Sequence, residues 1–406
     1  MDTLTKKADD MSCLRLTRRS LLWGLALLAL AGEVEGQEME QSSARPITVA
    51  CYYFPNWHTD PEKGKTTSEW GRLKVAYPRF DEHQQPKTPA WGYENEADPQ
   101  AMARKIAAAA DHGIDVFLFD YYCNDRVSDY LESALSKGYI RAANNDRVKF
   151  ALMWANHDLA GAKGEVSRQT FDRLAEHVVR DYMTHPSHWR IDGKPYFSIY
   201  QLGTLVRGLG GVEQTRQALD HFRALAKQAG LPGVHINAVD WGMKPDREPR
   251  QLVQALGVDS VTSYVWVHWV RLKDFPRTDY DYVLAQYLKH WEQNRQAYGA
   301  PYFPNVTMGW DSTPRIPANQ PHDGRGYPNT PVMSGNTPER FRRALELVRS
   351  RVLEQADGPR VVTINAWNEW GEGSYLEPDT VNGMAYLEAI KTVFPPKLAS
   401  DRKGDR

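Results

Sequence analysis

Two glutamates stand three positions apart in the segment NAWNEWGEGSYLEPD, which runs from Asn365 to Asp379 and follows an apolar run. Gly371 and Gly373 flank Glu372, and glycine permits a tight turn that would bring this carboxylate back beside Glu369. Two carboxylates at one pocket push their pKa values apart, so one can serve as acid and the other as base. Such a pair is typical of glycosidic-bond cleavage, in which one carboxyl protonates the leaving oxygen and the other assists attack at the anomeric carbon. The alternative is that Glu372 only caps the following helix.

A strand predicted over Val361–Trp370 positions Glu369. Side chains alternate along a strand, so one set points out to the helices and the other points into the mouth of a barrel. The outward set is Val362, Ile364 and Ala366, and the inward set is Thr363, Asn365, Trp367 and Glu369.

Seven more apolar runs of strand length precede this strand, and amphipathic stretches lie between them. The seven are Ile47–Pro55, Val116–Tyr122, Phe150–Asn156, Tyr196–Gln201, His235–Asp240, Ser260–Trp266 and Asn305–Asp311. Helix signals are Asp98-Pro99 with Gly113, Ser167, and Thr337-Pro338, and further helices fit 212–229, 247–256, 279–297 and 380–393.

Eight alternations of strand and helix predict an α/β fold, a single (β/α)8 TIM barrel that forms the catalytic domain over residues 46–396. The alternative is an open doubly wound sheet. That fold usually has a Gly-rich loop after its first strand, where this chain has Tyr52-Tyr53-Phe54-Pro55.

Two of the predicted loops are long, residues 56–97 after strand one and residues 312–336 after strand seven. Long loops in a compact domain are usually lids or binding loops. Both follow the C-terminal ends of strands, where TIM-barrel enzymes have their active sites. We therefore expect both loops to line the site.

Ten of the thirteen tryptophans fall at predicted strand ends or in the loops that follow them. A single tryptophan belongs more often to the core than to a binding site. Ten at one end of a barrel, with acids among them, instead suggest a cleft in which sugar C–H faces stack on rings while hydroxyls bind polar groups. The ten are Trp57, Trp70, Trp91, Trp154, Trp241, Trp266, Trp269, Trp310, Trp367 and Trp370.

Acids also end several of the predicted strands, as Asp120, Asp240 and Asp311 do. Each has an alternative role in bonding to nearby backbone or in starting a turn. Glu377 either binds a sugar hydroxyl or braces its loop. The predicted substrate-binding residues are Tyr53, Trp57, Glu69, Trp70, Asp120, Tyr121, Trp154, His157, Asp240, Trp266, Trp310, Asp311, Asn365, Trp367, Asn368 and Glu377, with Glu369 and Glu372 as the catalytic pair.

The sequence predicts neither a metal site nor a cofactor. His157 and His268 belong to different strands, and no HExxH or paired-cysteine spacing occurs. Asp279-Tyr280-Asp281 has the spacing of a transferase metal motif, but it opens a predicted helix, where capping explains it better. The chain also lacks the Gly-x-Ser-x-Gly elbow of serine hydrolases. Its formal net charge of −1 and the absence of a Lys/Arg block argue against a nucleic-acid partner.

The N-terminal residues have the pattern of an export signal over residues 1–31. Arg18-Arg19 precede an apolar run from Leu21 to Ala31, as in twin-arginine signals. An uncleaved anchor is the alternative, but a span needs roughly 20 apolar residues. The signal predicts a periplasmic or secreted protein with no membrane span in the mature chain. Residues 32–45 are then a linker, and residues 397–406 a polar tail.

Cys51 and Cys123 remain after removal of the signal. In an exported protein a disulfide between them is one alternative, and two separate buried thiols are the expectation.

The segment NAWNEWGEGSYLEPD resembles the signature of the glycoside hydrolase family 99-like group, whose bacterial members are often labelled WbsX-like. Other segments agree, among them CYYFPNWH from Cys51 to His58, Glu69-Trp70, and GWDSTPR from Gly309 to Arg315. The resemblance spans almost the whole chain after the linker.

Family 99 enzymes are retaining endo-α-mannosidases on a (β/α)8 barrel, with a Glu-x-x-Glu pair that Glu369 and Glu372 match. The resemblance implies that Glu369 is the base on the substrate 2-hydroxyl, which forms a 1,2-anhydrosugar, and that Glu372 is first acid and then base. It also implies a role for Glu377, because the family retains an acid there.

The sequence therefore predicts an exported glycoside hydrolase with a carbohydrate substrate, a poly- or oligosaccharide. Two alternatives stay open: a glycosyltransferase of polysaccharide biosynthesis, and a glycan-binding protein without catalysis.

Overall fold

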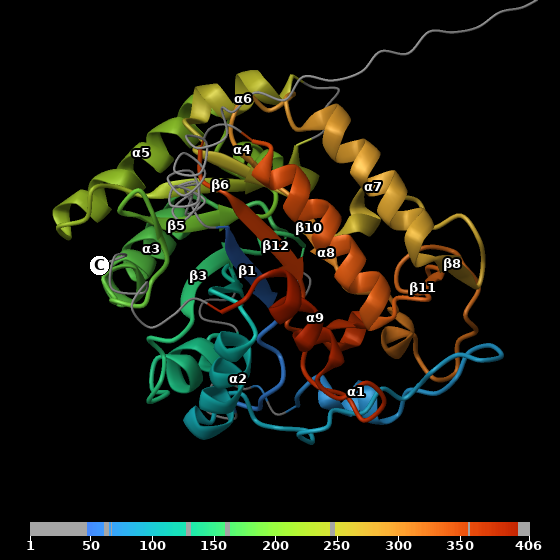
Figure 1. The fold of residues 1–406 in the computed structure, drawn as a ribbon. Helices are drawn as coiled ribbons and strands as arrows, with labels where there is room; N and C mark the ends of the chain where they lie inside the picture. Colours follow the sequence, from blue (N-terminus) through green and yellow to red (C-terminus); the bar gives the residue numbers. More distant parts are fainter. Residues whose placement is uncertain are drawn as a thin grey trace, which may run out of the picture. The chain divides into compact units, whose positions relative to one another are not determined.

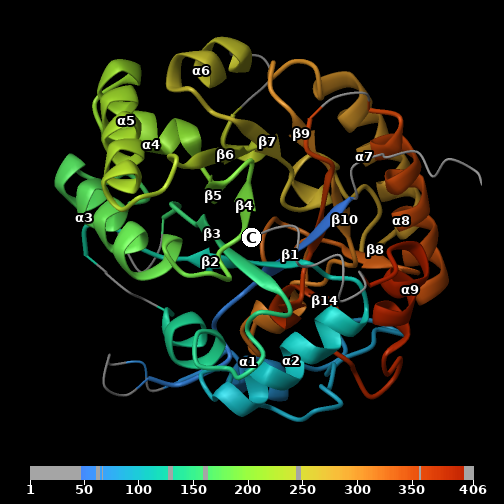
Figure 2. The same cartoon turned by 60° about the vertical axis from the view of Figure 1, so that its left-hand side comes forward.

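The computed structural model describes residues 47–60, 65, 67–126, 131–158, 163–243, 248–355 and 358–396. The predicted export signal, linker and polar tail lie outside these ranges. Parallel strands form a ring, and helices cover its outside (Figures 1 and 2). The strands of the ring are β1 (Thr48–Tyr53), β2 (Val116–Tyr121), β3 (Lys149–Trp154), β5 (Lys194–Ile199), β6 (His235–Val239), β7 (Ser260–Thr262), β9 (Tyr302–Phe303), β10 (Asn305–Thr307) and β12 (Val361–Asn365).

Strand seven of the barrel is made of two pieces, β9 and β10, which Pro304 separates. β9 pairs with β7 on one side, and β10 pairs with β12 on the other. Proline has no N–H to donate, and here its carbonyl instead accepts a hydrogen bond from the Thr363 backbone N–H (2.9 Å). The two half-strands complete an eight-position ring, so the predicted (β/α)8 barrel is confirmed.

Three of the described helices begin where local capping signals predicted them, whereas the helix Leu202–Gly208 was not predicted. Asp98, Ser167 and Thr337 each accept a hydrogen bond from a backbone N–H in the first turn of the following helix. The helices are α2 (Pro99–Asp111), α3 (Arg168–Val178), α4 (Leu202–Gly208), α5 (Val212–Gln228), α6 (Pro249–Leu256), α7 (Tyr280–Asn294), α8 (Pro338–Leu353) and α9 (Ala385–Val393).

The two long loops carry more structure than the sequence indicated. A short helix, α1 (Trp70–Lys74), lies in the first. In the other, β11 (Val332–Ser334) pairs with β8 (Arg277–Asp279) from the connection after β7. Two π-helical segments, Ala134–Tyr139 and Val179–Met183, and a short strand β4 (Arg190–Ile191) were not predicted.

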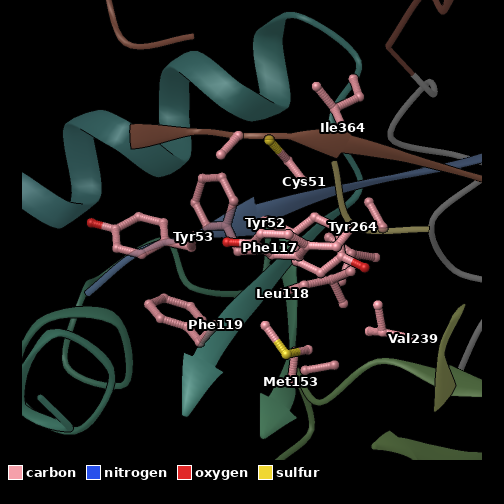
Figure 3. Close-up of a cluster of buried hydrophobic side chains, with 14 of the residues drawn as sticks. Cys51, Tyr52, Tyr53, Phe117, Leu118, Phe119, Met153, Val239, Tyr264 and Ile364 are labelled. Atoms are coloured by element: carbon pink, nitrogen blue, oxygen red, sulfur yellow. The ribbon is translucent and has the colours of Figure 1, made fainter. Parts of the chain in front are cut away.

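The core fills both the ring and the layer between strands and helices. Tyr52 meets Tyr264 edge to face, with ring centroids 4.6 Å apart, while its neighbour Tyr53 stacks on Phe119 at 4.5 Å (Figure 3). Cys51 is fully buried in the same cluster, and both it and Cys123 are reduced side chains. Two separate buried thiols are therefore what the fold contains.

Strand eight ends earlier than predicted, at Asn365 rather than Trp370. Beyond it, β13 (Asn368–Glu369) turns away from the ring and pairs with β14 (Ser374–Tyr375). The connecting 3-10 turn is Trp370–Glu372, and Gly373 follows it with a φ of +64°, a conformation that glycine adopts without strain. The sequence thus identified the turn but placed it on the end of a longer strand.

Candidate active site

A cavity of about 920 Å³ opens at the C-terminal ends of the barrel strands. Its volume lies at the upper end of the range that small-molecule sites usually have. The acidic, arginine and histidine side chains in its lining are Glu69, Arg72, Asp120, His157, His268, Arg271, Arg315, Glu369 and Glu372. The aromatic ones are Phe54, Tyr122, Tyr200, Trp241, Tyr264, Trp310 and Tyr327.

One guanidinium, that of Arg315, joins both glutamates of the Glu-x-x-Glu pair. Its Nη2 lies 2.8 Å from Glu369 Oε1, and its Nη1 binds Glu372. Its Nε lies 3.4 Å from Glu69 Oε1 on the first long loop. The hydroxyl of Tyr327 donates to Glu372 at 3.0 Å. Arg315 therefore fixes the separation of two carboxylates that would otherwise repel each other.

Glu369 is 3% exposed, and its environment changes its acidity. Burial raises the pKa of Glu369 well above its ordinary value, the Arg315 guanidinium opposes this, and Glu372 and Asp120 raise the pKa further. A carboxyl with a raised pKa is a stronger base when ionised, which suits general acid–base chemistry near neutral pH.

Asp120, at the end of β2, is a second buried carboxyl of this cavity. The hydroxyl of Tyr264 donates to its Oδ2 at 3.3 Å, while Oδ1 has no hydrogen-bond partner among the described residues. Burial raises the pKa of Asp120, and the hydrogen bond from Tyr264 only partly opposes this.

Six of the predicted contact and catalytic residues line the cavity: Glu69, Asp120, His157, Trp310, Glu369 and Glu372. Their positions follow from strand ends and loops, as expected for a barrel. The structure brings Glu369 and Glu372 to one guanidinium, which is the juxtaposition that the turn at Gly371 and Gly373 predicted.

Four predicted residues instead gather near the buried Glu96, just before α2. The Tyr53 hydroxyl, the Trp57 backbone N–H and the Asn368 amide all donate to its carboxylate, at 2.9, 2.6 and 3.4 Å. The Trp70 ring packs on Trp57 at a tilt of 41°, with centroids 4.1 Å apart. These side chains hold the first loop against the barrel.

Five other predicted residues lie in the core. Trp154 and Tyr121 contact α3 through Phe171 and His177, and Trp266 packs on Tyr280 and Tyr287 of α7. Asp240 is fully buried and accepts a hydrogen bond from the Tyr302 hydroxyl at 2.5 Å. Asn365 is also fully buried, and its carbonyl accepts the hydroxyl of Ser374 at 2.7 Å.

The predicted tryptophan-lined cleft needs correction. Of the ten tryptophans at this end of the barrel, Trp241 and Trp310 line the cavity within the described part of the chain. Six others are at most 5% exposed and pack within the interior of the protein: Trp57, Trp70, Trp154, Trp266, Trp367 and Trp370. The cavity wall is richer in tyrosine, because tyrosine combines an aromatic face with a hydroxyl that can bind neighbouring groups.

Trp367 and Glu377 lie outside the ring, so the prediction that Trp367 faces the mouth is wrong. The reason is the early end of β12, which breaks the side-chain alternation. The Trp367 ring lies 5.1 Å from Phe117, and its Nε1 donates to Glu377 at 2.9 Å. Glu377 also accepts Trp370 Nε1 at 2.7 Å and lies 2.6 Å from Lys105 Nζ on α2. Of its two predicted roles, Glu377 has the bracing one.

Replacing Lys105 by methionine is expected to destabilise the fold by about 3 kcal/mol, because it leaves the Glu377 carboxylate buried without its cation. Urea denaturation at pH 7 measures this loss. The matched control is the double variant K105M/E377Q, which removes both charges and should recover part of the stability. Equal stability of K105M and the wild type would contradict a stabilising ion pair.

Asp311 lies behind the turn that carries Glu372, in a second cavity of about 500 Å³. Its Oδ2 receives His83 Nε2, Gln85 Nε2 and Lys87 Nζ of the first loop, at 3.0, 2.7 and 3.3 Å. Its backbone N–H donates to the Glu372 carbonyl at 2.5 Å. Asp311 therefore links the first loop to the turn that carries Glu372.

Replacing Asp311 by asparagine is expected to cost about 3 kcal/mol of stability at pH 7. Burial would raise the pKa of Asp311, but Lys87, His83 and Thr313 together lower it well below its ordinary value. A lowered pKa stabilises the fold above about pH 4, the unfolded value, and this contribution is lost as pH falls further. The stability difference between D311N and the wild type should therefore shrink below pH 4. A difference that stays constant in denaturation curves from pH 7 to pH 3 would contradict this.

The sequence reasoning did not select Arg315, Tyr264, Tyr200 or Tyr327 as site residues. Arg315 stands in the segment GWDSTPR, which did carry the family resemblance. Arg315 could have been chosen only if the loop after strand seven had been known to face the first loop and the Glu369–Glu372 turn. The three acids that it contacts lie in those distant segments.

No cluster of metal-ligating side chains occurs in the part of the chain that the structure describes. Asp279 accepts hydrogen bonds from the Asp281 and Tyr282 backbone N–H groups and so caps α7, as predicted. Among the described helices, none has the length and apolar character of a membrane span.

Residues 49–390 match the model of the family described as Glycosyltransferase WbsX. Two proteins of Xanthomonas campestris pv. campestris, each called uncharacterized protein WxcX, are also similar to the chain. That of strain B100 is 28% identical over 397 residues, and that of strain ATCC 33913 is 27% identical over 394 residues. Each match covers 92% of this chain and 53% of the relative, so the chain spans about half the length of these proteins.

Solved structures with the same fold include the GH99 endo-alpha-mannosidase of Bacteroides thetaiotaomicron in complex with BIS-TRIS-propane. It has a TM-score of 0.57 and 16% identity, covering 88% of this chain and 98% of that one. A glycoside hydrolase-like protein has a TM-score of 0.60 and 16% identity, covering 87% and 95%. At this identity the likeness shows that the chain has a glycoside hydrolase-like (β/α)8 fold.

Proposed function

The chain belongs to the family described as Glycosyltransferase WbsX, and we propose that it acts on a poly- or oligosaccharide by hydrolysing its glycosidic bonds. The observation that carries the proposal is the carboxylate pair Glu369 and Glu372, which one guanidinium holds in a large cavity with aromatic walls. Paired carboxyls supply the acid and base that glycoside hydrolysis needs.

In the proposed reaction the configuration at the anomeric carbon is retained. Glu369 removes the proton from the sugar 2-hydroxyl as that oxygen attacks the anomeric carbon, while Glu372 protonates the departing glycosidic oxygen. Glu372 then deprotonates a water that opens the 1,2-anhydrosugar, and Glu369 returns its proton to O2. The resemblance to family 99 supports these roles, as does the raised pKa of Glu369.

Hydrolysis is tested by incubating the protein with plant, algal and bacterial polysaccharides without any nucleotide sugar. New reducing ends are expected, and NMR of the first product should show the anomer of the original linkage. The size of the products separates internal cleavage from terminal cleavage. Glycans that bind the protein but yield no reducing ends would contradict hydrolysis.

Sugar transfer is the second candidate, and the family description favours it. Against it, the Asp279-Tyr280-Asp281 motif is used for helix capping, and Arg340 pairs with Asp279 at 2.8 Å. Chain extension that depends on an added nucleotide sugar would support transfer. Equal glycan yields with and without the donor would count against it.

We also propose that the protein acts outside the cytoplasm, because residues 1–31 have the pattern of a twin-arginine signal. Fusion of residues 1–45 to a folded reporter tests this. The reporter should reach the periplasm, and the change of Arg18 and Arg19 to lysine should retain it in the cytoplasm.

A further inference from the structure

The cavity extends across the whole mouth of the barrel. In the ring of strands, β6 stands opposite β1, with three strand positions between them on either side. The connections after β6 and β7 supply the end of the cavity that is far from the first loop. Its lining there is Trp241, Val267, His268, Val270, Arg271 and Leu272, and we name this end the distal rim.

Trp241 gives the distal rim a fixed aromatic surface. It lies in the 3-10 turn Asp240–Gly242 directly after β6, and it is 41% exposed. Its ring stacks on His268, with centroids 4.4 Å apart and planes inclined by 22°. A held tryptophan with an open face is suited to stacking against the C–H face of a sugar.

His268 holds that surface without adding charge. Its Nε2 shares a hydrogen bond with the Tyr200 hydroxyl at 3.1 Å. Burial lowers the pKa of His268 to about 3, so the imidazole is neutral at physiological pH. Any charge that the distal rim presents to a glycan therefore comes from another residue.

Arg271 supplies that charge. The cavity has three arginines, of which Arg315 contacts Glu369, Glu372 and Glu69, and Arg72 lies 3.4 Å from Glu69. Arg271 has no carboxylate partner among the residues that the structure describes. An arginine fork matches the geometry of a carboxylate or another oxyanion. Within the described part of the chain, the cation is thus open to an anion from a bound ligand.

We propose that the distal rim is a subsite for an anionic sugar residue, whose ring stacks on Trp241 while its acidic group pairs with Arg271. The inference rests on the proposed function, because it names the class of glycan: an acidic chain that reaches from the catalytic pair to the distal rim. The aliphatic side chains Val267, Val270 and Leu272 line the same rim and add apolar surface to it.

The test compares a glucuronate-containing oligosaccharide with the same oligosaccharide after carboxyl reduction. Arg271→Gln is expected to lower kcat/KM for the acidic form at least about tenfold and to leave the reduced form unchanged, since charge-assisted hydrogen bonds are lost only with the acid. Trp241→Ala should lower both. Arg349→Gln, at an exposed position on α8, is the matched control and should change neither. Equal effects of R271Q on both forms, or no effect, would overturn the proposal.

Binding to the E369Q protein separates this inference from the proposed function. Calorimetry should show at least about tenfold weaker binding of the acidic oligosaccharide when R271Q is added to E369Q. That result would support the subsite even if the wild-type protein cleaved no glycan, whereas equal affinities would overturn the subsite even if cleavage were efficient. An oligosaccharide of uncharged sugars that carries sulfate esters tells whether Arg271 selects a carboxylate or any oxyanion.

Discussion

Replacing Glu369 or Glu372 by glutamine is expected to lower kcat for glycan hydrolysis by about 10² to 10⁴-fold, the usual range for a general acid or base. Glutamine keeps the shape of the side chain and its contact with Arg315 but can neither take up nor release the proton. Initial rates of reducing-end formation measure the effect. Because both residues act in one reaction, the double variant should be little slower than the slower single variant.

The matched control is Glu346→Gln on α8, where the carboxylate pairs with Arg342 at the surface. It should retain wild-type activity. Thermal unfolding of each variant shows whether a lost rate reflects a lost fold. Wild-type rates in either E369Q or E372Q would remove the basis of the proposed mechanism.

Replacing Arg315 by methionine is expected to lower kcat at least about 10²-fold, because the two carboxylates lose the group that fixes their positions. It should also move the acid limb of the kcat/KM profile to higher pH. Burial raises the pKa of Glu369 and Arg315 opposes this, so removal of the guanidinium raises that pKa further. A base must be ionised to act, and Glu369 would then ionise only at higher pH.

Arg315→Lys separates the two contributions. Lysine retains the positive charge but lacks the fork that reaches two carboxylates, so the acid limb should move less while kcat stays low. An acid limb at the wild-type pH in R315M would show that Arg315 positions Glu369 without changing its acidity.

Much of the fold could be predicted because its signals are local. Asp98, Ser167 and Thr337 cap their helices with their own side chains. The eight strands could be identified from their own apolar runs, without knowing which strands pair with each other. The break at Pro304 and the end of β12 at Asn365 depend on pairing with strands far away in the sequence. The sequence therefore predicted the barrel, but not how strand seven closes it.

The candidate site was harder to predict than the fold. The glycines on either side of Glu372 predicted the turn that brings it to Glu369, because the residues that favour a turn lie within the turn itself. Residue type alone could not tell Trp241, with an open face, from the fully buried Trp154. Residue type also could not show that Asp311 pairs with Lys87 and Glu377 with Lys105, because these ion pairs join distant segments.

The catalytic pair and the distal rim lie on different connections of the barrel. Arg315, Glu369 and Glu372 follow β10 and β12, whereas Trp241 and Arg271 follow β6 and β7. Substitutions in the connections after β6 and β7 can therefore accumulate without disturbing the ion pairs of Arg315 with Glu369 and Glu372. Under the proposed function, relatives of this chain can diverge in the glycans they accept while they keep the same carboxylate pair, and engineering of new specificity would start at Trp241 and Arg271.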